Sequence, residues 1–458
     1  MLMSRLHKFT KTLISSTACL AAPLPRDEFA RRRWELMKAM GRDAIAIIAA
    51  APVHLRNNDV EHAYRQDSDF FYLTGFREPE SVAVFVPGRA QGEYLLFVRD
   101  RDPARETWDG RRAGPVGVRR DFSADDAFPI ADIDDILPGL MENHPKIFYT
   151  LGVNLEFDQR VVGWMNSLRA QAKQGRHAPH EMVALQHVLH DLRLYKSRGE
   201  LELMRCAAQI AARAHVRAMR FCKPGLFEYQ VQAEIEHEFK SSRACTSYLP
   251  IVGGGANGCI LHYHENASLL RAGDLLLIDA GCEYESYASD ITRTFPVNGS
   301  YSKPQLELYN LVLAANCAAI EAVKPGADWN RPHEVAVQVL TTGLVELGLL
   351  KGRVLSLIKS LAYRRFYMHK TGHWLGLDVH DVGDYKIGNQ WRVLEPGMVL
   401  TIEPGLYIPP GARGVPPKFR NIGIRIEDDV LVTRDGNEVL SVAAPKEAAV
   451  IEALMAAR

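Results

Sequence analysis

The spacing of hydrophobic residues differs between the first and the second part of this chain. In the first part, short apolar runs with the length of buried strands are separated by segments with helical spacing, such as residues 157–172. The helical pattern begins near Asp27, where apolar residues around Trp34 fall on one broad face. The strands are expected at residues 44–50, 82–86, 94–98 and 147–151. This pattern predicts an α/β domain over residues 26–190, in which the polar and aromatic segment 64–72 forms a surface loop or the edge of a strand.

The second part, residues 191–458, repeats one order of elements. Capping boxes at Ser197 and Ser302 each predict the start of a helix, and each helix ends at a Lys-Pro-Gly turn. A second amphipathic helix follows in each copy, at residues 227–241 and 332–347, and strands come after it. Two copies are too few for a solenoid. The pattern therefore predicts an α+β domain with an internal pseudo-twofold duplication.

One strand in each copy ends in a carboxylate. Residues 272–281 and 396–405 share a turn glycine, an apolar run, a carboxylate and a closing glycine, and Asp279 matches Glu403 at an offset of 124 residues. Burying an unpaired carboxylate is costly. Two carboxylates at equivalent places therefore indicate one site shared by the two halves, with a metal ion as their partner.

A further carboxylate follows in each half. Asp290 shares one face of an alternating segment with Thr292, and Glu427 shares a face with Arg425 after the alternating residues 422–426. Four carboxylates in one place repel one another, and one arginine cannot neutralise them, whereas two divalent ions can.

Histidines surround these carboxylates in the sequence, at His262, His369, His373 and His380. A lone strand-end aspartate is more often a turn residue, and a lone histidine is usually a core residue. The joint pattern within residues 262–427 favours a metal site instead. One imidazole with four carboxylates suits Mn²⁺, Co²⁺, Fe²⁺ or Zn²⁺. Two such ions can activate a hydroxide between them, which is typical of a hydrolase.

Composition excludes several other classes of protein. Lys and Arg number 55, as do Asp and Glu, so the formal net charge is zero, and no basic tract indicates a nucleic-acid partner. No apolar run approaches the ~20 residues of a membrane span. The seven cysteines are scattered and lack a CxxC pair, which favours reduced thiols in the cytoplasm over disulfides or a zinc ribbon.

The first 25 residues differ from the rest of the chain. Residues 1–25 carry three basic residues, several Ser and Thr, and no acid. Their apolar part is short and interrupted. We expect a disordered extension, with a targeting segment as the alternative.

The motifs around the carboxylates resemble the pita-bread metallopeptidases, and within them bacterial aminopeptidase P. They are ILHYHEN at 260–266, IDAGCEY at 278–284, DITRTFP at 290–296, GHWLGLDVHDVG at 372–383 and IRIEDD at 424–429. In the first domain, YRQDSDF at 64–70 and TGFREP at 74–79 are similar to the N-terminal domain of that enzyme. The resemblance covers nearly all of the chain after residue 25.

This resemblance implies a set of five metal ligands, which are Asp279, Asp290, His373, Glu403 and Glu427. Asp290 and Glu427 would bridge two divalent ions, Mn²⁺ being the first expectation. Asp279 would complete one ion, and His373 and Glu403 the other.

The resemblance also implies an activity, the hydrolysis of the N-terminal Xaa-Pro bond of peptides with proline in second position. A metal-bridging hydroxide would attack the carbonyl before proline, and Glu403 would pass a proton to the leaving nitrogen. His262 or His380 would stabilise the oxyanion. His369 and Arg425 are expected to contact the substrate or lie beside the metals.

Aminopeptidase P is a homotetramer in which a neighbouring subunit walls the active site. Asp59 and Trp108 lie at positions similar to the contributing residues, so we expect a homo-oligomer, a tetramer or a dimer. The alternatives are that Asp59 is an acidic residue of a loop and that Trp108 is a buried aromatic residue. The chain departs from the expected pattern at residues 370–372, between two histidines, and in the loop at 409–413.

Two other functions stay open from the sequence. A prolidase would act only on Xaa-Pro dipeptides, but prolidases carry a longer insertion between Glu403 and Glu427. A non-catalytic module of this fold would only bind peptides, but such modules lose metal ligands, and all five ligand types are present here.

Overall fold

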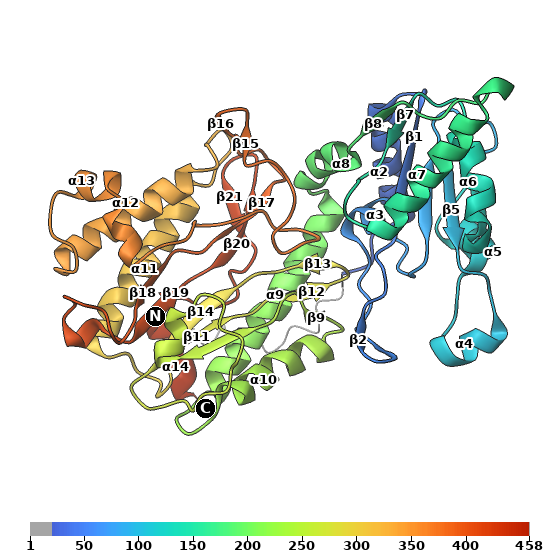
Figure 1. Cartoon of the computed structure of the whole chain (residues 1–458). Helices are drawn as coiled ribbons and strands as arrows, with labels where there is room; N and C mark the ends of the chain where they lie inside the picture. Colours follow the sequence, from blue (N-terminus) through green and yellow to red (C-terminus); the bar gives the residue numbers. More distant parts are fainter. Residues whose placement is uncertain (1–20, 458) are drawn as a thin grey trace. The chain divides into compact units, whose positions relative to one another are not determined.

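The computed structural model describes residues 21–457, which divide into two compact units (Figure 1). The first unit spans Leu24–Arg193, and the second begins at Leu194. Most of the predicted N-terminal extension, residues 1–20, lies outside the described residues. None of the described helices is both long and apolar enough to span a membrane.

The first unit is built on a six-stranded sheet in the order β6-β5-β4-β1-β7-β8. β1 is central, antiparallel to β4 on one side and parallel to β7 on the other. The strands are β1 (Ala44–Ala49), β4 (Val82–Phe85), β5 (Tyr94–Val98), β6 (Asp126–Pro129), β7 (Lys146–Phe148) and β8 (Glu181–Val183). The four apolar runs of the sequence are four of these strands, so the predicted α/β architecture is confirmed.

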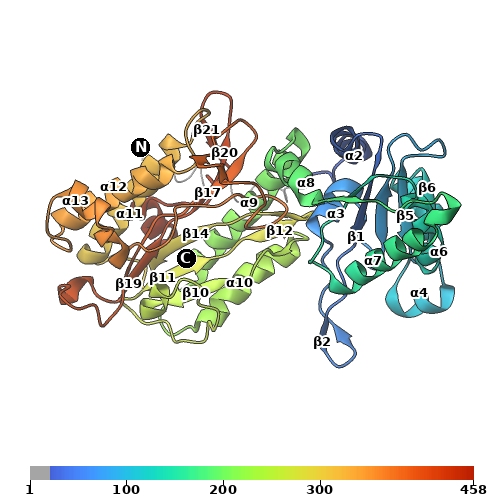
Figure 2. The same cartoon turned by 45° about the horizontal axis from the view of Figure 1, so that its top comes forward.

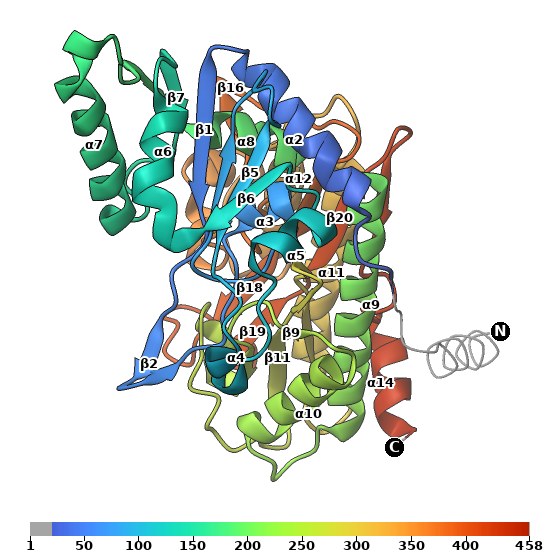
Figure 3. The ribbon, with the colours of Figure 1, turned by 90° about the vertical axis from the view of Figure 1, so that its right-hand side faces the viewer.

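Helices cover both faces of this sheet (Figure 3). On one face, α6 (Ile133–Met141) and α7 (Leu155–Ala170) pack against β1, β4 and β5 and complete an apolar core. On the other face lies α2 (Arg26–Met40), whose Arg33 guanidinium stacks 4.1 Å from the ring centroid of Tyr94 on β5. The remaining elements are α3 (Ser68–Thr74), α4 (Pro103–Asp109), α5 (Gly114–Asp121), α8 (Leu185–Leu194) and the hairpin β2 (Leu55–Asn57) with β3 (Val60–Glu61).

The prediction of a surface loop or strand edge at residues 64–72 is wrong, because this segment leads into the buried helix α3. The Asp67 side chain accepts a hydrogen bond from the Phe70 N–H and caps the helix. The Gln66 side chain accepts from the Ala51 N–H and donates to the Glu78 carbonyl. The polar residues thus form hydrogen bonds with buried backbone groups, and the aromatic residues fill the core. The polarity of the segment therefore does not indicate exposure to solvent.

The second unit contains the predicted duplication of helix pairs. The first pair is α9 (Arg198–Phe221) with α10 (Glu228–Ser241), and the second is α11 (Lys303–Ala322) with α12 (Arg331–Glu346). Both predicted capping boxes are present, at Ser197 and Ser302. Two shorter helices, α13 (Val354–Lys359) and α14 (Ala448–Ala456), complete the helical layer.

Each helix pair flanks strands of its own half (Figure 2). The first half has the sheet β10 (Ile251–Gly254), β11 (Leu275–Asp279) and β14 (Thr292–Pro296), and a small sheet of β9 (Cys245–Thr246), β12 (Cys282–Tyr284) and β13 (Tyr287–Ala288). The second half has β17 (Val399–Ile402), β20 (Asp428–Val432) and β21 (Asn437–Val439), and the pairs β18 (Gly405–Ile408) with β19 (Ile422–Arg425) and β15 (Lys386–Ile387) with β16 (Gln390–Trp391).

The two halves are hydrogen-bonded to each other where β14 meets the end of β19. The Glu427 N–H donates to the Thr292 carbonyl at 3.1 Å. The Thr294 hydroxyl donates to the Arg425 carbonyl at 3.0 Å. The last residues of β19 and the first of β14 are therefore held side by side.

Candidate metal centre

Residues from both halves of the second unit line one cavity of about 300 Å³. The cavity gathers the five predicted metal ligands and the four other residues that the sequence placed in this unit's site, namely Asp279, Asp290, His373, Glu403, Glu427, His262, His369, His380 and Arg425. The segments that the sequence singled out thus converge in space.

Strand ends position three of the four carboxylates. Asp279 is the last residue of β11 and lies opposite Thr292 of β14. Glu403 follows β17, and its N–H donates to the Thr371 carbonyl at 2.8 Å. Glu427 lies between β19 and β20. The backbone of a residue at a strand end is held by the hydrogen bonds of the sheet, while its side chain is free to point away from the sheet. Such a position suits a metal ligand that must be held in place.

Three of these residues already form a group that can hold one ion. One donor atom from each of Asp290, His373 and Glu427 lies within 4.8 Å of the other two. The His373 Nε2 atom is 3.3 Å from Asp290 Oδ2 and 4.0 Å from Glu403 Oε1. Its Nδ1 atom is 2.9 Å from the Trp374 carbonyl, so Nδ1–H donates there and Nε2 faces the carboxylates.

The electrostatics of the centre show a deficit of positive charge. Burial, together with the neighbouring carboxylates, raises the pKa of Glu427 well above its ordinary value. Burial likewise raises the pKa of Glu403 to about 7. Burial opposes the charged form of His373, but a hydrogen bond and the charge of Asp290 outweigh it and raise the pKa of His373 to about 9. Hard or borderline divalent cations would relieve this repulsion, so the donor set fits the expected metals.

Tyr248 is part of the centre and was missed by the sequence analysis. Its hydroxyl oxygen lies 2.5 Å from Asp279 Oδ1 and 2.6 Å from Asp290 Oδ1. The one hydroxyl proton can be donated to only one of the two carboxylates. No periodic pattern surrounds this tyrosine in the sequence, so no local signal could have revealed it.

Arg425 connects the carboxylates to the histidines. Its guanidinium donates to Asp279 Oδ2 at 2.6 Å, to the Thr292 hydroxyl at 3.1 Å and to the Tyr407 hydroxyl at 3.0 Å. The Tyr407 hydroxyl is also 2.9 Å from His369 Nε2. The arginine therefore compensates one carboxylate and fixes the position of the ring beside it.

The other histidines lie around the ligands. The His369 Nδ1 atom is 3.7 Å from Glu403 Oε2, and burial with the charge of Arg425 lowers the pKa of His369 to about 3. The His380 ring is 4.3 Å from the His373 ring, centroid to centroid, and His380 is exposed. His262 lines the same cavity. The neutral His369 uses its one N–H on the Lys370 carbonyl, 2.7 Å from Nδ1, whereas the exposed His380 can donate a hydrogen bond to a substrate.

Asp59 and Trp108 belong to the first unit and do not line this cavity. Asp59 lies in the exposed turn between β2 and β3. Trp108 lies on α4 with 86% of its surface exposed, so the alternative of a buried aromatic is wrong. The functional role of both residues stays a prediction.

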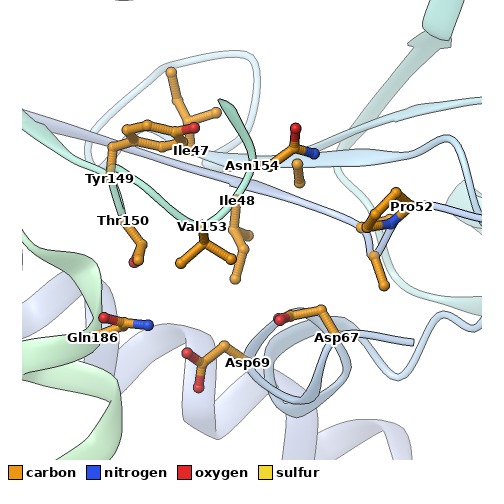
Figure 4. Close-up of a pocket in the computed structure, with 13 residues that line it drawn as sticks. Ile47, Ile48, Pro52, Asp67, Asp69, Tyr149, Thr150, Val153, Asn154 and Gln186 are labelled. Carbon is orange, nitrogen blue, oxygen red and sulfur yellow. The ribbon is translucent and has the colours of Figure 1, made fainter. Parts of the chain in front are cut away.

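The first unit contains a separate cavity of about 140 Å³ at the ends of β1 and β7 (Figure 4). Asp67 and Asp69 line it beside apolar residues such as Ile47 and Val153. Asp69 is paired with the Arg193 guanidinium at 2.8 Å, and the Asp67 carboxylate caps α3. Both carboxylates therefore have partners within this unit.

Comparison with known proteins finds a matching family model for each unit. Residues 202–434 match the description "Metallopeptidase family M24", and residues 29–149 match "Aminopeptidase P, N-terminal domain". The chain belongs to metallopeptidase family M24, with the N-terminal domain of aminopeptidase P.

Similar proteins identify the branch of that family. The chain is 46% identical to the Xaa-Pro aminopeptidase of Escherichia coli over 95% of this chain and 98% of the relative. The structure of aminopeptidase PepP from Pseudomonas aeruginosa matches with a TM-score of 0.94 and 58% identity, over 95% of this chain and 99% of that one. A variant of E. coli aminopeptidase P in complex with substrate matches with a TM-score of 0.93, 45% identity and the same coverage. The predicted family and fold are confirmed, and aminopeptidase P is favoured over prolidase.

Proposed function

We propose that this chain is an Xaa-Pro aminopeptidase that removes the first residue of peptides with proline in second position. The observation that carries the proposal is the cavity in which four carboxylates and His373 converge. Support comes from the 46% identity with an Xaa-Pro aminopeptidase over nearly the whole length of both chains.

The metals of the proposal are two divalent ions, with Mn²⁺ as the first expectation and Co²⁺, Fe²⁺ or Zn²⁺ as the alternatives. Asp290 and Glu427 would be shared by both ions, Asp279 would complete one, and His373 and Glu403 would complete the other. When bound, such a pair supplies a hydroxide nucleophile at neutral pH and polarises the carbonyl that it attacks.

Glu403 is the residue that carries the proton in this reaction. The leaving proline nitrogen is a poor leaving group until it is protonated, so an acid near that nitrogen is required. His369 lies beside this carboxyl, with its Nδ1 atom 3.7 Å from Glu403 Oε2.

His262 and His380 would donate hydrogen bonds to the oxygen on which negative charge develops. The free amine of the substrate would lie near Asp279, whose other carboxylate oxygen is held by Arg425 at 2.6 Å. His369 and Arg425, which both contact the Tyr407 hydroxyl, would border the substrate in the same cavity.

The same proposal extends to assembly and location. A homo-oligomer, a tetramer or a dimer, would cover the exposed Trp108 and bring Asp59 and Trp108 to the site of a neighbouring subunit. Trp108 is 86% exposed in the single chain, which is unusual for a tryptophan and typical of an interface. No disulfide joins cysteines within residues 21–457, which agrees with a cytoplasmic protein.

Hydrolysis of Arg-Pro-Pro and of Ala-Pro, after EDTA treatment and after return of Mn²⁺, tests the function. Cleavage of the tripeptide that is lost with EDTA and restored by Mn²⁺ is the expected result. Cleavage of the dipeptide alone would instead identify a prolidase. Absence of cleavage of either peptide by the metal-loaded enzyme would refute the proposal.

A further inference from the structure

The wall of the catalytic cavity contains a positive charge that the metal chemistry does not use. Lys370 lines the cavity together with the metal ligands. Its Nζ atom lies 5.6 Å from the centroid of the Trp391 ring, and the Nζ atom of Lys386 lies 4.2 Å from the same centroid. The hairpin of β15 and β16 therefore places a second lysine and a half-buried indole beside Lys370.

Arg364 adds a third charge to this group. It lies in the short 3-10 helix Ala362–Arg365, and it is exposed, as are Lys370 and Lys386. Burial lowers the pKa of Lys370, and the nearby charges of Arg364 and Lys386 lower it further. We call these three residues the rim cations.

The rim cations have no acidic partner among the described residues. Ion pairs elsewhere in the unit join most buried cations to carboxylates, for example Arg293 to Asp428 at 2.7 Å. Within residues 21–457, by contrast, no carboxylate lies within ion-pair distance of a rim cation. Three like charges held together beside an apolar ring repel one another, and an anion among them would relieve that repulsion.

The position of Lys370 relative to Glu403 indicates which part of a peptide it meets. The Lys370 carbonyl is 2.7 Å from His369 Nδ1, and that same nitrogen is 3.7 Å from Glu403 Oε2. Glu403 serves the leaving nitrogen, whereas the substrate amine lies towards Asp279. The main chain of Lys370 therefore lies next to His369 on the Glu403 side of the cavity that Lys370 lines, which is the side of the departing product, beyond the proline.

We propose that Lys370, supported by Arg364 and Lys386, binds a carboxylate carried by the residue that follows proline. This inference rests on the proposed Xaa-Pro aminopeptidase function and specifies its substrates. The carboxylate is either the free C-terminus of a tripeptide or the side chain of Asp or Glu in a longer peptide. The rim cations thus select peptides by charge, and the metal centre selects them by the bond that is cleaved.

Three peptides of equal length distinguish these sources, namely Ala-Pro-Ala, Ala-Pro-Ala-amide and Ala-Pro-Glu-amide. The Mn²⁺-loaded enzyme should cleave each of the two anionic peptides with a KM about threefold to fivefold lower than that of the neutral amide, the upper range for one partly exposed charge pair. The preference should weaken as salt concentration rises. A preference for Ala-Pro-Ala alone assigns the C-terminus, and a preference for Ala-Pro-Glu-amide alone assigns the side chain.

Single substitutions test whether Lys370 is responsible. K370Q should bring the ratio of KM values close to one, K370R should retain it, and K386Q should reduce it in part. K351Q is the matched control, since Lys351 is exposed and does not line the cavity, and it should keep the ratio of the unsubstituted enzyme.

Two failures can be told apart. If the unsubstituted enzyme cleaves all three peptides with equal KM, or if K370Q retains the full preference, the carboxylate inference is wrong and the aminopeptidase function stands. If the metal-loaded enzyme cleaves none of the three peptides, both are wrong.

Discussion

Individual contacts at the metal centre show how the protein tolerates four buried carboxylates. Tyr248 contacts Asp279 and Asp290, and Arg425 holds the second oxygen of Asp279. The Thr292 hydroxyl donates to Glu427 Oε2 at 2.6 Å. These donors orient the carboxylates but supply only one full positive charge besides His373, and bound divalent cations would complete the compensation.

Asp290 is the residue whose loss should affect the centre most. As a shared ligand it would serve both ions, so Asp290→Ala should remove more than one metal ion per chain and lower kcat/KM for Ala-Pro-Ala at least about 1,000-fold. Elemental analysis of the purified variant and peptide hydrolysis measure both effects. Glu265→Ala, a change of an exposed acid that does not line the cavity, is the control. Full activity of Asp290→Ala would contradict the two-metal assignment.

His215 supports the same centre from α9, outside the ligand set. It is fully buried, and its Nε2 atom lies 3.1 Å from the carbonyl of Ala280, the residue after Asp279. Burial, with the charge of Arg293, lowers the pKa of His215 to about 4. The imidazole is therefore neutral in the folded protein at pH 7, and it links the helix to the strand that carries a ligand.

This histidine predicts a loss of stability in acid. The pKa of an unfolded histidine is about 6.5, so the unfolded state binds more protons than the folded state between pH 6.5 and 4. The contribution of the neutral His215 to the free energy of unfolding is fully present above pH 6.5 and is lost as the pH falls through 4. At pH 5 the loss amounts to about 2 kcal/mol. Urea unfolding of the metal-free protein at pH 7 and pH 5 measures it.

A comparison of variants isolates the effect of His215 from that of the carboxylates. His215→Asn should lose about 2 kcal/mol less between pH 7 and pH 5 than the unsubstituted protein. His177→Asn, at an exposed position, should lose as much as the unsubstituted protein. Equal losses for all three proteins would mean that His215 does not titrate as described.

At the scale of elements, close backbone contacts set the positions of the ligand-bearing strands. A Cβ atom at Gly281 would lie 1.7 Å from the Ser289 carbonyl oxygen, and one at Gly372 would lie 1.9 Å from the Thr401 carbonyl oxygen. Gly281 follows Asp279 by two residues, and Gly372 precedes His373 directly. Glycine is required at both places because backbone lies where a side chain would be.

Gly281→Ala should therefore disturb the metal centre as well as the fold. The contact is with backbone, which cannot move aside as a flexible side chain can, so we expect a loss of about 3 kcal/mol or more in the free energy of unfolding. Weaker metal binding should accompany it. Thermal unfolding and metal titration measure the two effects, and Gly436→Ala, where a Cβ meets nothing within 4 Å, is the matched control.

At the scale of the whole molecule, the metal site lies within one compact unit. The residues that line the cavity all belong to the unit that begins at Leu194. Metal binding should therefore stabilise that unit directly, and Leu24–Arg193 contributes no ligand to it in the single chain.

Metal removal should accordingly lower the stability of one unit more than that of the other. A ligand present at 1,000 times its Kd stabilises the state that binds it by about 4 kcal/mol. Calorimetry before and after EDTA should show that the unfolding temperature of the second unit falls. The unfolding temperature of Leu24–Arg193 should change little. Asp290→Ala with added Mn²⁺ should show no upward shift. Equal movement of both transitions would mean that the units unfold together.

The sequence by itself determined the features that depend on local order. The strands at 44–50 and 94–98, the capping boxes at Ser197 and Ser302 and the duplicated carboxylate strands follow from periodicity and residue type. These properties belong to neighbouring residues, so they can be read without a structure. The duplication then predicted that the two carboxylate strands would meet, and the structure confirms that they line one cavity.

Only the tertiary structure decided which distant side chains share a neighbourhood. Tyr248 reaches two carboxylates that come 31 and 42 residues later in the chain. Lys370 meets Lys386 at the ring of Trp391. The segment 64–72 leads into a buried helix because its polar side chains form hydrogen bonds with backbone groups elsewhere in the fold. Such partnerships arise when separate segments pack together, and no spacing within a single segment records them.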